Sequence, residues 1–161
     1  MCIRDRAWLA GQSDLVDAFE NGEDVYKIMA SAIYGKNVED IAQNERFVGK
    51  TTILGAGYGM GSKKFQAQLK TFNVEVEEDE AAHIIRVYRE TYEQIPNLWT
   101  QGRRAIEAMA RGQSAVFGNG CVSVDGQSGI LLPNGLYQRY PNLRKINSSE
   151  GEQSVSYTHL T

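Results

Sequence analysis

The stretch NERFVGKTTILGAGYGMG, Asn44 to Gly61, decides how the rest of the chain is interpreted. Four of its residues recur at intervals of four: Arg46, Lys50, Leu54 and Tyr58. On an α-helix, residues four apart drift by only about 40° per step, so these side chains would form one stripe roughly 18 Å long. Two cations would lie at one end of the stripe and an aromatic ring at the other. That order suits a nucleotide, because cations bind the triphosphate and the ring lies near the base.

Glycine occupies every second position from Gly55 to Gly61. Such glycines would let a base or a template strand approach the backbone closely. They also cost about 1 kcal/mol each in a helix, so the residues alone predict that the helix ends near Leu54. The simplest alternative is therefore an exposed basic helix followed by a flexible glycine loop.

Two glycine-rich nucleotide motifs do not fit these residues. A phosphate-binding loop, G-x-x-x-x-G-K-[ST], would end at residues 49–51, but its first glycine falls on Asn44 and the preceding segment is polar. In the dinucleotide fingerprint G-x-G-x-x-G, the third glycine falls on Met60. A phosphate-loop NTPase stays an alternative only if a strand precedes Gly49.

The composition bounds the class of protein. The 161 residues are 42% apolar and 23% charged, which is ordinary for one soluble domain. The net charge of −3 gives no general nucleic-acid footprint, so any polyanion site must be a local cluster. No apolar run approaches the roughly 20 residues of a membrane span, and no secretory signal is recognised. Cys2 and Cys121 suggest no disulfide framework, so a reducing cytoplasm is expected.

Both ends of the chain resemble a translated sequencing-library adapter. The segment MCIRDR, residues 1–6, can be encoded by a short DNA element whose reverse complement encodes VSYTHL, residues 155–160. One element in inverted orientation would explain both ends at once. We therefore predict that residues 1–6 and 155–161 are adapter-derived, and that the natural sequence runs from about Ala7 to Ser154.

Apolar periodicity predicts helices over residues 13–112, followed by a small antiparallel β-meander. Asp24 is expected to cap a helix that Gly35 ends. Asn-Gly and Asp-Gly pairs between residues 119 and 135 are turn signals between short strands. A short amphipathic helix over residues 62–73 is expected to bury three side chains: Phe65, Leu69 and Phe72. The predicted fold class is α+β and mostly α.

From Arg46 to Gly59, the pattern R-x-x-x-K-x-x-x-L-x-x-x-Y-G resembles motif B of the family A DNA polymerases, the bacterial polymerase I group and its phage relatives. Residues 7–12, AWLAGQ, are similar to the segment after motif A, and residues 18–35 resemble the family block A-F-x-x-G-x-D-[IV]-[HY]. Residues 130–144 resemble a phage-type segment between motifs B and C. The matching segments follow one another in the same order as in the family. The resemblance therefore implies that this chain is an internal fragment of a phage-like member and that it spans motif B.

The resemblance implies a role for each motif residue, because motif B lies on the fingers helix that closes over the incoming nucleotide. Arg46 and Lys50 match residues that contact the triphosphate, and Lys50 also matches the proposed catalytic proton donor to the leaving pyrophosphate. Leu54 stands where phenylalanine or tyrosine usually contacts the sugar, a departure that bears on fidelity, sugar selectivity and speed. Tyr58 matches the tyrosine at the base of the nucleotide pocket, so Tyr58 and Gly59 are expected beside the template.

The resemblance also implies two Mg²⁺ ions, because this family holds two divalent metals with carboxylates of motifs A and C. Residues 7–154 begin after motif A and contain no His-Asp-Glu tripeptide, so the ligands are expected outside this chain and no metal ligand is assigned. The acidic run at residues 75–80 is expected to open a helix, where negative charge suits the N-terminal dipole. His83 on that helix is expected to be a surface or packing residue.

These inferences divide the chain into a palm-edge segment at residues 7–22, helical fingers of a right-hand polymerase at residues 23–112, and a β-rich segment at residues 113–154 that returns toward the palm. The expected full-length parent is a DNA-directed DNA polymerase, which is a nucleotidyltransferase. Its expected location is the cytoplasm, or the cytoplasm of the host cell if a phage encodes it. Its partners would be primer–template DNA and dNTPs, and the fragment alone is expected to be inactive. A non-catalytic helical module that binds nucleotide or nucleic acid stays an alternative.

Overall fold

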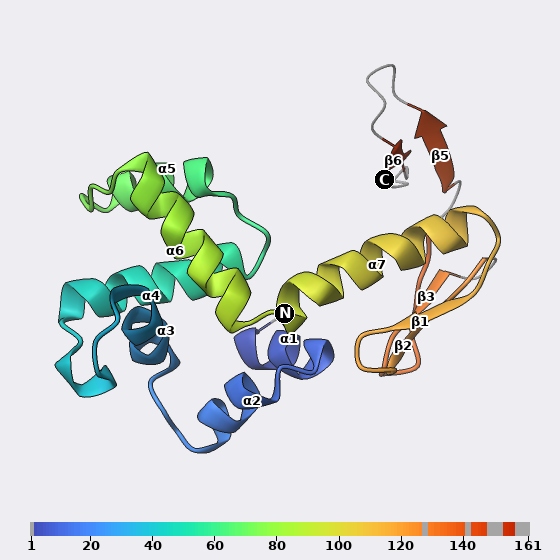
Figure 1. The fold of residues 1–161 in the computed structure, drawn as a ribbon. Coiled ribbons are helices and arrows are strands. Elements are labelled where there is room, and N and C mark those ends of the chain that lie inside the picture. The colour runs from blue at the N-terminus through green and yellow to red at the C-terminus, as the bar shows by residue number, and fades with distance from the viewer. Residues whose placement is uncertain (1, 127–128, 141–142, 148–152, 157–161) are drawn as a thin grey trace. The chain divides into compact units, whose positions relative to one another are not determined.

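The computed structural model (Figure 1) describes four stretches of the chain: residues 2–126, 129–140, 143–147 and 153–156. The chain divides into two compact units, Met1–Pro96 and Asn97–Thr161. The first unit is helical, and the second holds the strands. Among the described residues, no helix is both long enough and apolar enough to cross a lipid bilayer.

The helices of the first unit follow one another with short connections. Their bounds in the described residues are α1 Ile3–Ala10, α2 Ser13–Glu20, α3 Val25–Tyr34, the 3₁₀ turn η1 Val38–Asp40, α4 Gln43–Ala56, α5 Ser62–Thr71 and α6 Glu78–Thr91. α7, Gln94–Ala110, begins at the end of this unit and continues into the second. The helical part of the predicted fold class is therefore confirmed.

The caps of α3 follow from the local sequence. Oδ1 of Asp24 accepts hydrogen bonds from the backbone N–H groups of Tyr26 at 3.1 Å and Lys27 at 3.2 Å. These groups have no partner within the helix, so the carboxylate satisfies them. Gly35 ends the helix in the left-handed conformation, at a φ of +63°. Both predicted caps are confirmed.

α3 and α4 approach each other closely because Gly49 has no side chain. A Cβ atom on Gly49 would lie 2.3 Å from the carbonyl oxygen of Tyr26 and 3.0 Å from the backbone nitrogen of Ala30. The first distance is far below any real contact of a Cβ atom, so glycine is required here. The close approach sets the middle of α4 beside the first turns of α3.

α5 and α6 complete the core of the first unit together with α4. Their fully buried side chains include Ile53, Phe65, Leu69, Ile84 and Tyr88. The buried rings of Tyr88 and Tyr92 meet edge to face, with their centroids 5.5 Å apart. Burial of this apolar area is the main force that holds the helices together.

Phe72 departs from the prediction that it is buried. Its side chain is 53% exposed, although Phe65 and Leu69 of the same helix are fully buried as predicted. α5 ends at Thr71, so Phe72 is the C-cap and no longer follows the helical interval that carries the other two inward. Its ring instead packs edge to face with the ring of Phe47, with the centroids 5.3 Å apart.

The second unit carries the predicted β-meander. Its antiparallel sheet has the order β1-β2-β3-β4, with β1 Ala115–Phe117, β2 Val122–Asp125, β3 Gly129–Leu131 and β4 Tyr137–Gln138. The connection between β1 and β2 includes Asn119 and Gly120, whose φ angles are +54° and +79°. Asn-Gly tolerates this left-handed conformation, which makes the predicted turn possible. The α+β fold class is therefore confirmed.

A further antiparallel pair, β5 Arg144–Asn147 with β6 Gln153–Ser156, follows the meander. Of the predicted adapter-derived ends, residues 3–6 lie in α1 and residues 155–156 lie in β6. Met1 and residues 157–161 lie outside the described residues. The adapter origin and the palm and fingers boundaries stay predictions.

Candidate functional site

α4 exposes one residue in four along its central turns. Between Val48 and Gly57 only Lys50 and Leu54 are exposed, and the other eight positions are buried. Leu54 is 41% exposed, and Tyr58, which follows at the same interval, is 64% exposed. The exposed positions therefore repeat at the predicted interval of four, and the core of the chain leaves them free for another use.

Tyr58 lies beyond the end of α4, so the stripe expected from the interval of four does not stay on one helix. α4 ends at Ala56, two residues later than the predicted end near Leu54. In the turn that follows, the Tyr58 N–H donates to the Gly55 carbonyl oxygen at 3.0 Å, and Gly59 has a φ of +79°. The phenol thus projects from a turn, because the backbone leaves the helix at the glycines.

Arg46 is held by two side chains from the start of α3. Its Nε donates to Oδ2 of Asp24 at 2.7 Å. Its guanidinium also lies over the ring of Tyr26, 5.2 Å from the centroid, which is a cation–π contact. The Arg46 side chain stays 32% exposed. Arg46 is therefore oriented by the fold and still accessible from solvent.

Asp24 divides its carboxylate between two partners. Oδ1 caps α3, while Oδ2 accepts the hydrogen bond from Arg46. Partial burial works to raise the pKa of this carboxyl, but the hydrogen bonds from Arg46 and from two backbone N–H groups outweigh it and hold the pKa below its ordinary value of 3.8. Asp24 is therefore ionised at neutral pH.

Lys50 lies one turn further along α4 and is exposed. Its Nζ lies 6.0 Å from the centroid of the Tyr26 ring, at the outer limit of a cation–π contact. Among the described residues its ammonium has no hydrogen bond or ion pair. Arg46 and Lys50 thus share one aromatic neighbour and leave donor groups free for an anion.

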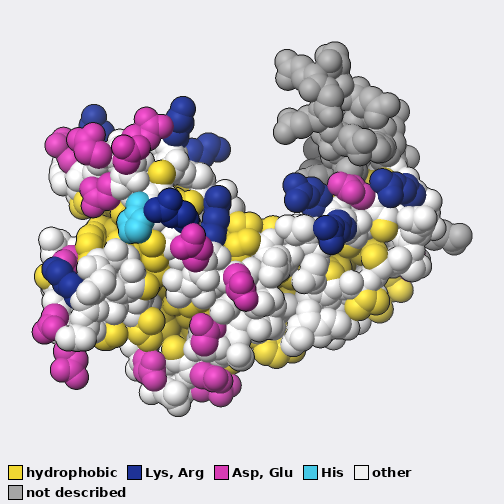
Figure 2. Space-filling model, viewed as in Figure 1, with side chains coloured by type: hydrophobic (Ala, Val, Ile, Leu, Met, Phe, Trp, Pro, Cys, Tyr) yellow, Lys and Arg dark blue, Asp and Glu magenta, His cyan; other side chains and the backbone are white. Residues whose placement is uncertain are grey.

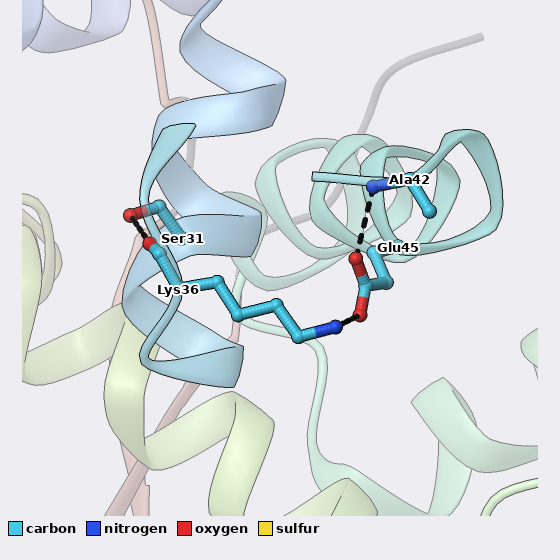
Figure 3. Close-up of polar contacts among 4 residues, drawn as sticks. All are labelled: Ser31, Lys36, Ala42 and Glu45. Atoms are coloured by element: carbon cyan, nitrogen blue, oxygen red, sulfur yellow. Dashed lines mark hydrogen bonds and ion pairs between the residues drawn. The ribbon is translucent and has the colours of Figure 1, made fainter. Parts of the chain in front are cut away.

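Glu45 ties the start of α4 to the end of α3 (Figure 3). Its Oε2 accepts from the Ala42 N–H at 2.9 Å, and its Oε1 pairs with the Lys36 ammonium. The Lys36 carbonyl oxygen accepts from the Ser31 hydroxyl at 2.5 Å. The hydrogen bond from Lys36 holds the pKa of the Glu45 carboxyl below its ordinary value. These contacts fix where α4 begins relative to α3.

Two of the four glycines after Leu54 are buried against the chain itself. A Cβ atom on Gly55 would lie 3.0 Å from the sulfur of Met60, and one on Gly57 would lie 2.1 Å from the guanidinium of Arg6. Their space is filled by these side chains. At these two positions an added side chain would meet other side chains of this chain, and the close approach of a base or template strand stays a prediction.

Gly59 and Gly61 border open space next to Tyr58. A Cβ atom on either glycine would meet nothing within 4 Å. They belong to a surface hollow of about 600 Å³, lined by Gly55 and residues 58–64. Its volume is within the range of small-molecule sites, so Tyr58 and Gly59 lie on a wall with room for a planar ring.

Two other kinds of site are absent from the described residues. Gly49 lies inside α4 rather than after a strand, which excludes the phosphate-loop NTPase. Within the part of the chain that the structure describes, no group of three or more His, Cys, Asp or Glu residues could hold a metal ion. Glu78, Asp79 and Glu80 occupy the first turn of α6, as predicted for the acidic run.

Acidic and basic side chains are interspersed on the face drawn in Figure 2. Nδ1 of His83 lies 3.0 Å from Nη2 of Arg86. His83 is exposed, which confirms that it is a surface residue.

The motif residues and their surroundings match a known protein family. The sequence profile of DNA polymerase family A matches residues 3–118 of this chain, which include α4 and every predicted site residue. The chain belongs to DNA polymerase family A. The resemblance inferred from the motif B pattern is confirmed.

Individual family A relatives match different shares of the chain. DNA polymerase I of Synechocystis sp. is 33% identical over 110 residues, which are 68% of this chain and 10% of that protein. DNA polymerase of Bacillus phage SP02 is 26% identical over 159 residues, which are 94% of this chain and 24% of that protein. DNA polymerase I of Aquifex aeolicus is 34% identical over 68 residues, 42% of this chain and 12% of that protein. The chain thus spans between a tenth and a quarter of the length of these relatives, and its similarity to a phage polymerase agrees with the phage-like assignment.

The sequence-based prediction missed the residues that support Arg46. Asp24 was expected as a helix cap alone, and Tyr26 had no assigned role, yet both contact the Arg46 guanidinium. Both are defined positions of the block A-F-x-x-G-x-D-[IV]-[HY]. That block therefore pointed to Asp24 and Tyr26 as candidate site residues, although its sequence does not show that they contact α4.

Proposed function

We propose that this chain contributes the nucleotide-binding fingers helix of a DNA-directed DNA polymerase, with α4 as that helix. The observation that supports this most is the exposure along α4, where Lys50 and Leu54 reach solvent between buried neighbours. Neither side chain is needed for packing in the core. They lie four residues apart on one side of the helix, where a bound nucleotide could contact both. The proposed reaction of the parent is template-directed addition of dNTPs to a primer 3′ end.

Arg46 and Lys50 would bind the triphosphate. The Arg46 guanidinium can bind phosphate oxygens through its planar fork, and the Lys50 ammonium acts as a point charge. Lys50 would also donate a proton to the leaving pyrophosphate, since its ammonium is exposed. Arg46 would hold the phosphates in register while that proton moves.

Leu54 and Tyr58 would contact the sugar and the base. Leu54 offers a flexible apolar surface without a ring, so its grip on the sugar would be weaker than that of an aromatic residue. The Tyr58 ring and Gly59 border the hollow beside α5, where a template base could stack. This division leaves the cations at one end of the site and the ring at the other.

The two Mg²⁺ ions of the proposed reaction would need carboxylates from outside the described residues. The residues present here do not fit such a site, because no suitable cluster of acidic, His or Cys side chains occurs among those that the structure describes. No metal-dependent step is therefore assigned to this chain. We expect the chain alone to bind dNTPs weakly and not to extend a primer. The proposed partner of the parent is primer–template DNA. The proposed location is the cytoplasm of the producing or host cell.

Substitution of Lys50 in the full-length polymerase tests the proposal. We expect Lys50→Ala to lower the single-turnover rate of nucleotide incorporation by about 10²- to 10⁴-fold, the range for loss of a general acid. Lys70→Ala, at an exposed lysine of α5, is the matched control and should leave the rate unchanged. Near-normal turnover of Lys50→Ala would remove Lys50 from its catalytic role.

A further inference from the structure

A carboxylate lies against the cation that is proposed to bind the triphosphate. Oδ2 of Asp24 is 2.7 Å from Nε of Arg46, in a site where a negative charge should repel phosphate. We propose that Asp24 is a positioning residue for nucleotide binding, which holds Arg46 by Nε so that its remaining N–H groups face the phosphates. This inference rests on the proposed function of α4.

The contact leaves the phosphate-binding part of Arg46 free. A guanidinium has five N–H donors, and Asp24 engages the Nε–H. Among the described residues the other donors of Arg46 have no hydrogen-bond partner, and the side chain is 32% exposed. The Tyr26 ring lies 5.2 Å from the guanidinium carbon and limits its rotation. Asp24 and an anion can therefore bind Arg46 at the same time.

The charge of Asp24 is compensated on its other side. Oδ1 accepts hydrogen bonds from two backbone N–H groups in the first turn of α3, where the helix dipole is positive. This reduces the repulsion that the carboxylate exerts on a nearby phosphate. Fixing the long Arg46 side chain before the nucleotide arrives removes an ordering cost from binding. We therefore expect the positioning effect to outweigh the repulsion.

The two oxygens allow the two tasks of Asp24 to be separated. Asparagine is as good a helix cap as aspartate, so Asp24→Asn should keep the α3 cap through its amide oxygen. The amide has no second oxygen to accept a hydrogen bond from the Arg46 Nε. Asp24→Ser is the second variant, because serine also caps helices but is too short to reach Arg46 in the same way.

A double-mutant cycle in the full-length polymerase tests the proposal, with Asp24→Asn, Arg46→Ala and both together. We expect Asp24→Asn to raise KM for the dNTP about fivefold and to leave kcat within about twofold. The rise in KM corresponds to the cost of ordering one long side chain, Arg46, when the nucleotide binds. Asp24→Ser should behave alike. In the Arg46→Ala background, Asp24→Asn should have no further effect.

Each other outcome overturns the positioning role. If Asp24→Asn leaves KM unchanged, or raises it equally in the Arg46→Ala background, Asp24 does not act through Arg46. If Arg46→Ala itself leaves KM unchanged, the proposed function of this site fails as well. A raised KM in Arg46→Ala with a silent Asp24→Asn rejects the positioning role alone.

A measurement on the 161-residue chain adds a direct readout of the contact. In ¹⁵N NMR spectra of the arginine side chains, we expect the Nε–H of Arg46 to exchange slowly with water. Asp24→Asn should abolish this protection while the melting temperature changes little, since the cap remains. An unprotected Arg46 Nε–H in the unsubstituted chain would overturn the proposal.

Discussion

Arg6 is a buried residue whose charge is poorly satisfied. Its side chain is 2% exposed, and its Nη2 donates to the carbonyl oxygen of Ile53 at 3.3 Å. Among the described residues, its Nε and Nη1 have no hydrogen-bond partner. A buried donor without a partner costs about 1–3 kcal/mol. We expect Arg6→Met, which keeps the length and removes the charge, to raise the free energy of unfolding by about 1–2 kcal/mol in urea titrations.

The control for this substitution lies on the same helix. Arg4 is exposed, so Arg4→Met should change the free energy of unfolding by less than about 0.5 kcal/mol. The Arg6 guanidinium carbon also lies 4.6 Å from the centroid of the Tyr58 ring. If Arg6→Met instead destabilises the chain, then this contact and the hydrogen bond to Ile53 outweigh the unsatisfied donors of Arg6. The adapter origin of residues 1–6 stays a prediction.

For single residues, exposure was more predictable from the sequence than contact. The interval of four indicated that Lys50 and Leu54 of α4 face solvent, because helical periodicity is a local property. It did not indicate that Arg46 pairs with Asp24, which lies 22 positions earlier in the sequence. The position of Asp24 at the start of a helix was explained by capping alone, so nothing in the sequence suggested a second contact with Arg46.

At the level of elements, the contact between α3 and α4 depends on Gly49. We expect Gly49→Ala to lower the free energy of unfolding by about 1–2 kcal/mol, even though alanine favours helices by about 1 kcal/mol. The added Cβ atom would lie 2.3 Å from the Tyr26 carbonyl oxygen, and a backbone atom cannot move away cheaply. Thermal or urea unfolding followed by circular dichroism at the helical band measures the change.

Gly102 of α7 provides the matched control for helix propensity. A Cβ atom there would lie 3.9 Å from the nearest atom, which belongs to the Phe117 ring. Gly102→Ala should therefore stabilise its unit by up to about 1 kcal/mol. A Gly49→Ala variant that also gains stability would show that α3 and α4 can separate slightly without loss.

Element ends were predictable where one residue determines them. Asp24 and Gly35 bound α3 as expected, because capping involves backbone groups only a few residues away. The end of α4 was placed two residues too early, since buried glycines inside a well-packed helix are stabilised by tertiary contacts that propensity does not include. The prediction that Phe72 is buried was also wrong because of a helix end, since α5 ends at Thr71, one residue before it.

At the scale of the whole molecule, the order of the elements followed from the sequence, and the contacts between them did not. The β-meander was predictable because each turn signal joins neighbouring strands. The support of α4 by α3, through Gly49 and Arg46, depends on side chains far apart in the sequence. The interval in the sequence therefore indicates exposed residues of the candidate site, whereas the contacts that hold Arg46 depend on the fold.

The stability of the first unit should depend on alkaline pH through two buried tyrosines. Burial raises the pKa of Tyr88 to about 12 and raises the pKa of Tyr92 above its ordinary value of 10.0, with the charge of Asp14 adding to the shift at Tyr92. Because the pKa values are higher in the folded state, the unfolded chain loses these protons first. Stability is therefore full below pH 10 and falls as the pH rises toward 12.

Tyr88→Phe isolates one of the two groups. The Tyr88 hydroxyl has no partner among the described residues, so its removal should leave stability at pH 7 unchanged or slightly increased. Between pH 10 and 12, the free energy of unfolding should fall less steeply in Tyr88→Phe than in the unsubstituted chain, as measured by urea titrations at successive pH values. Tyr58→Phe, at an exposed tyrosine, should follow the unsubstituted chain. Equal slopes for Tyr88→Phe and the unsubstituted chain would mean that the Tyr88 hydroxyl reaches water in the folded state, and that the core between α4 and α6 is more open than its burial indicates.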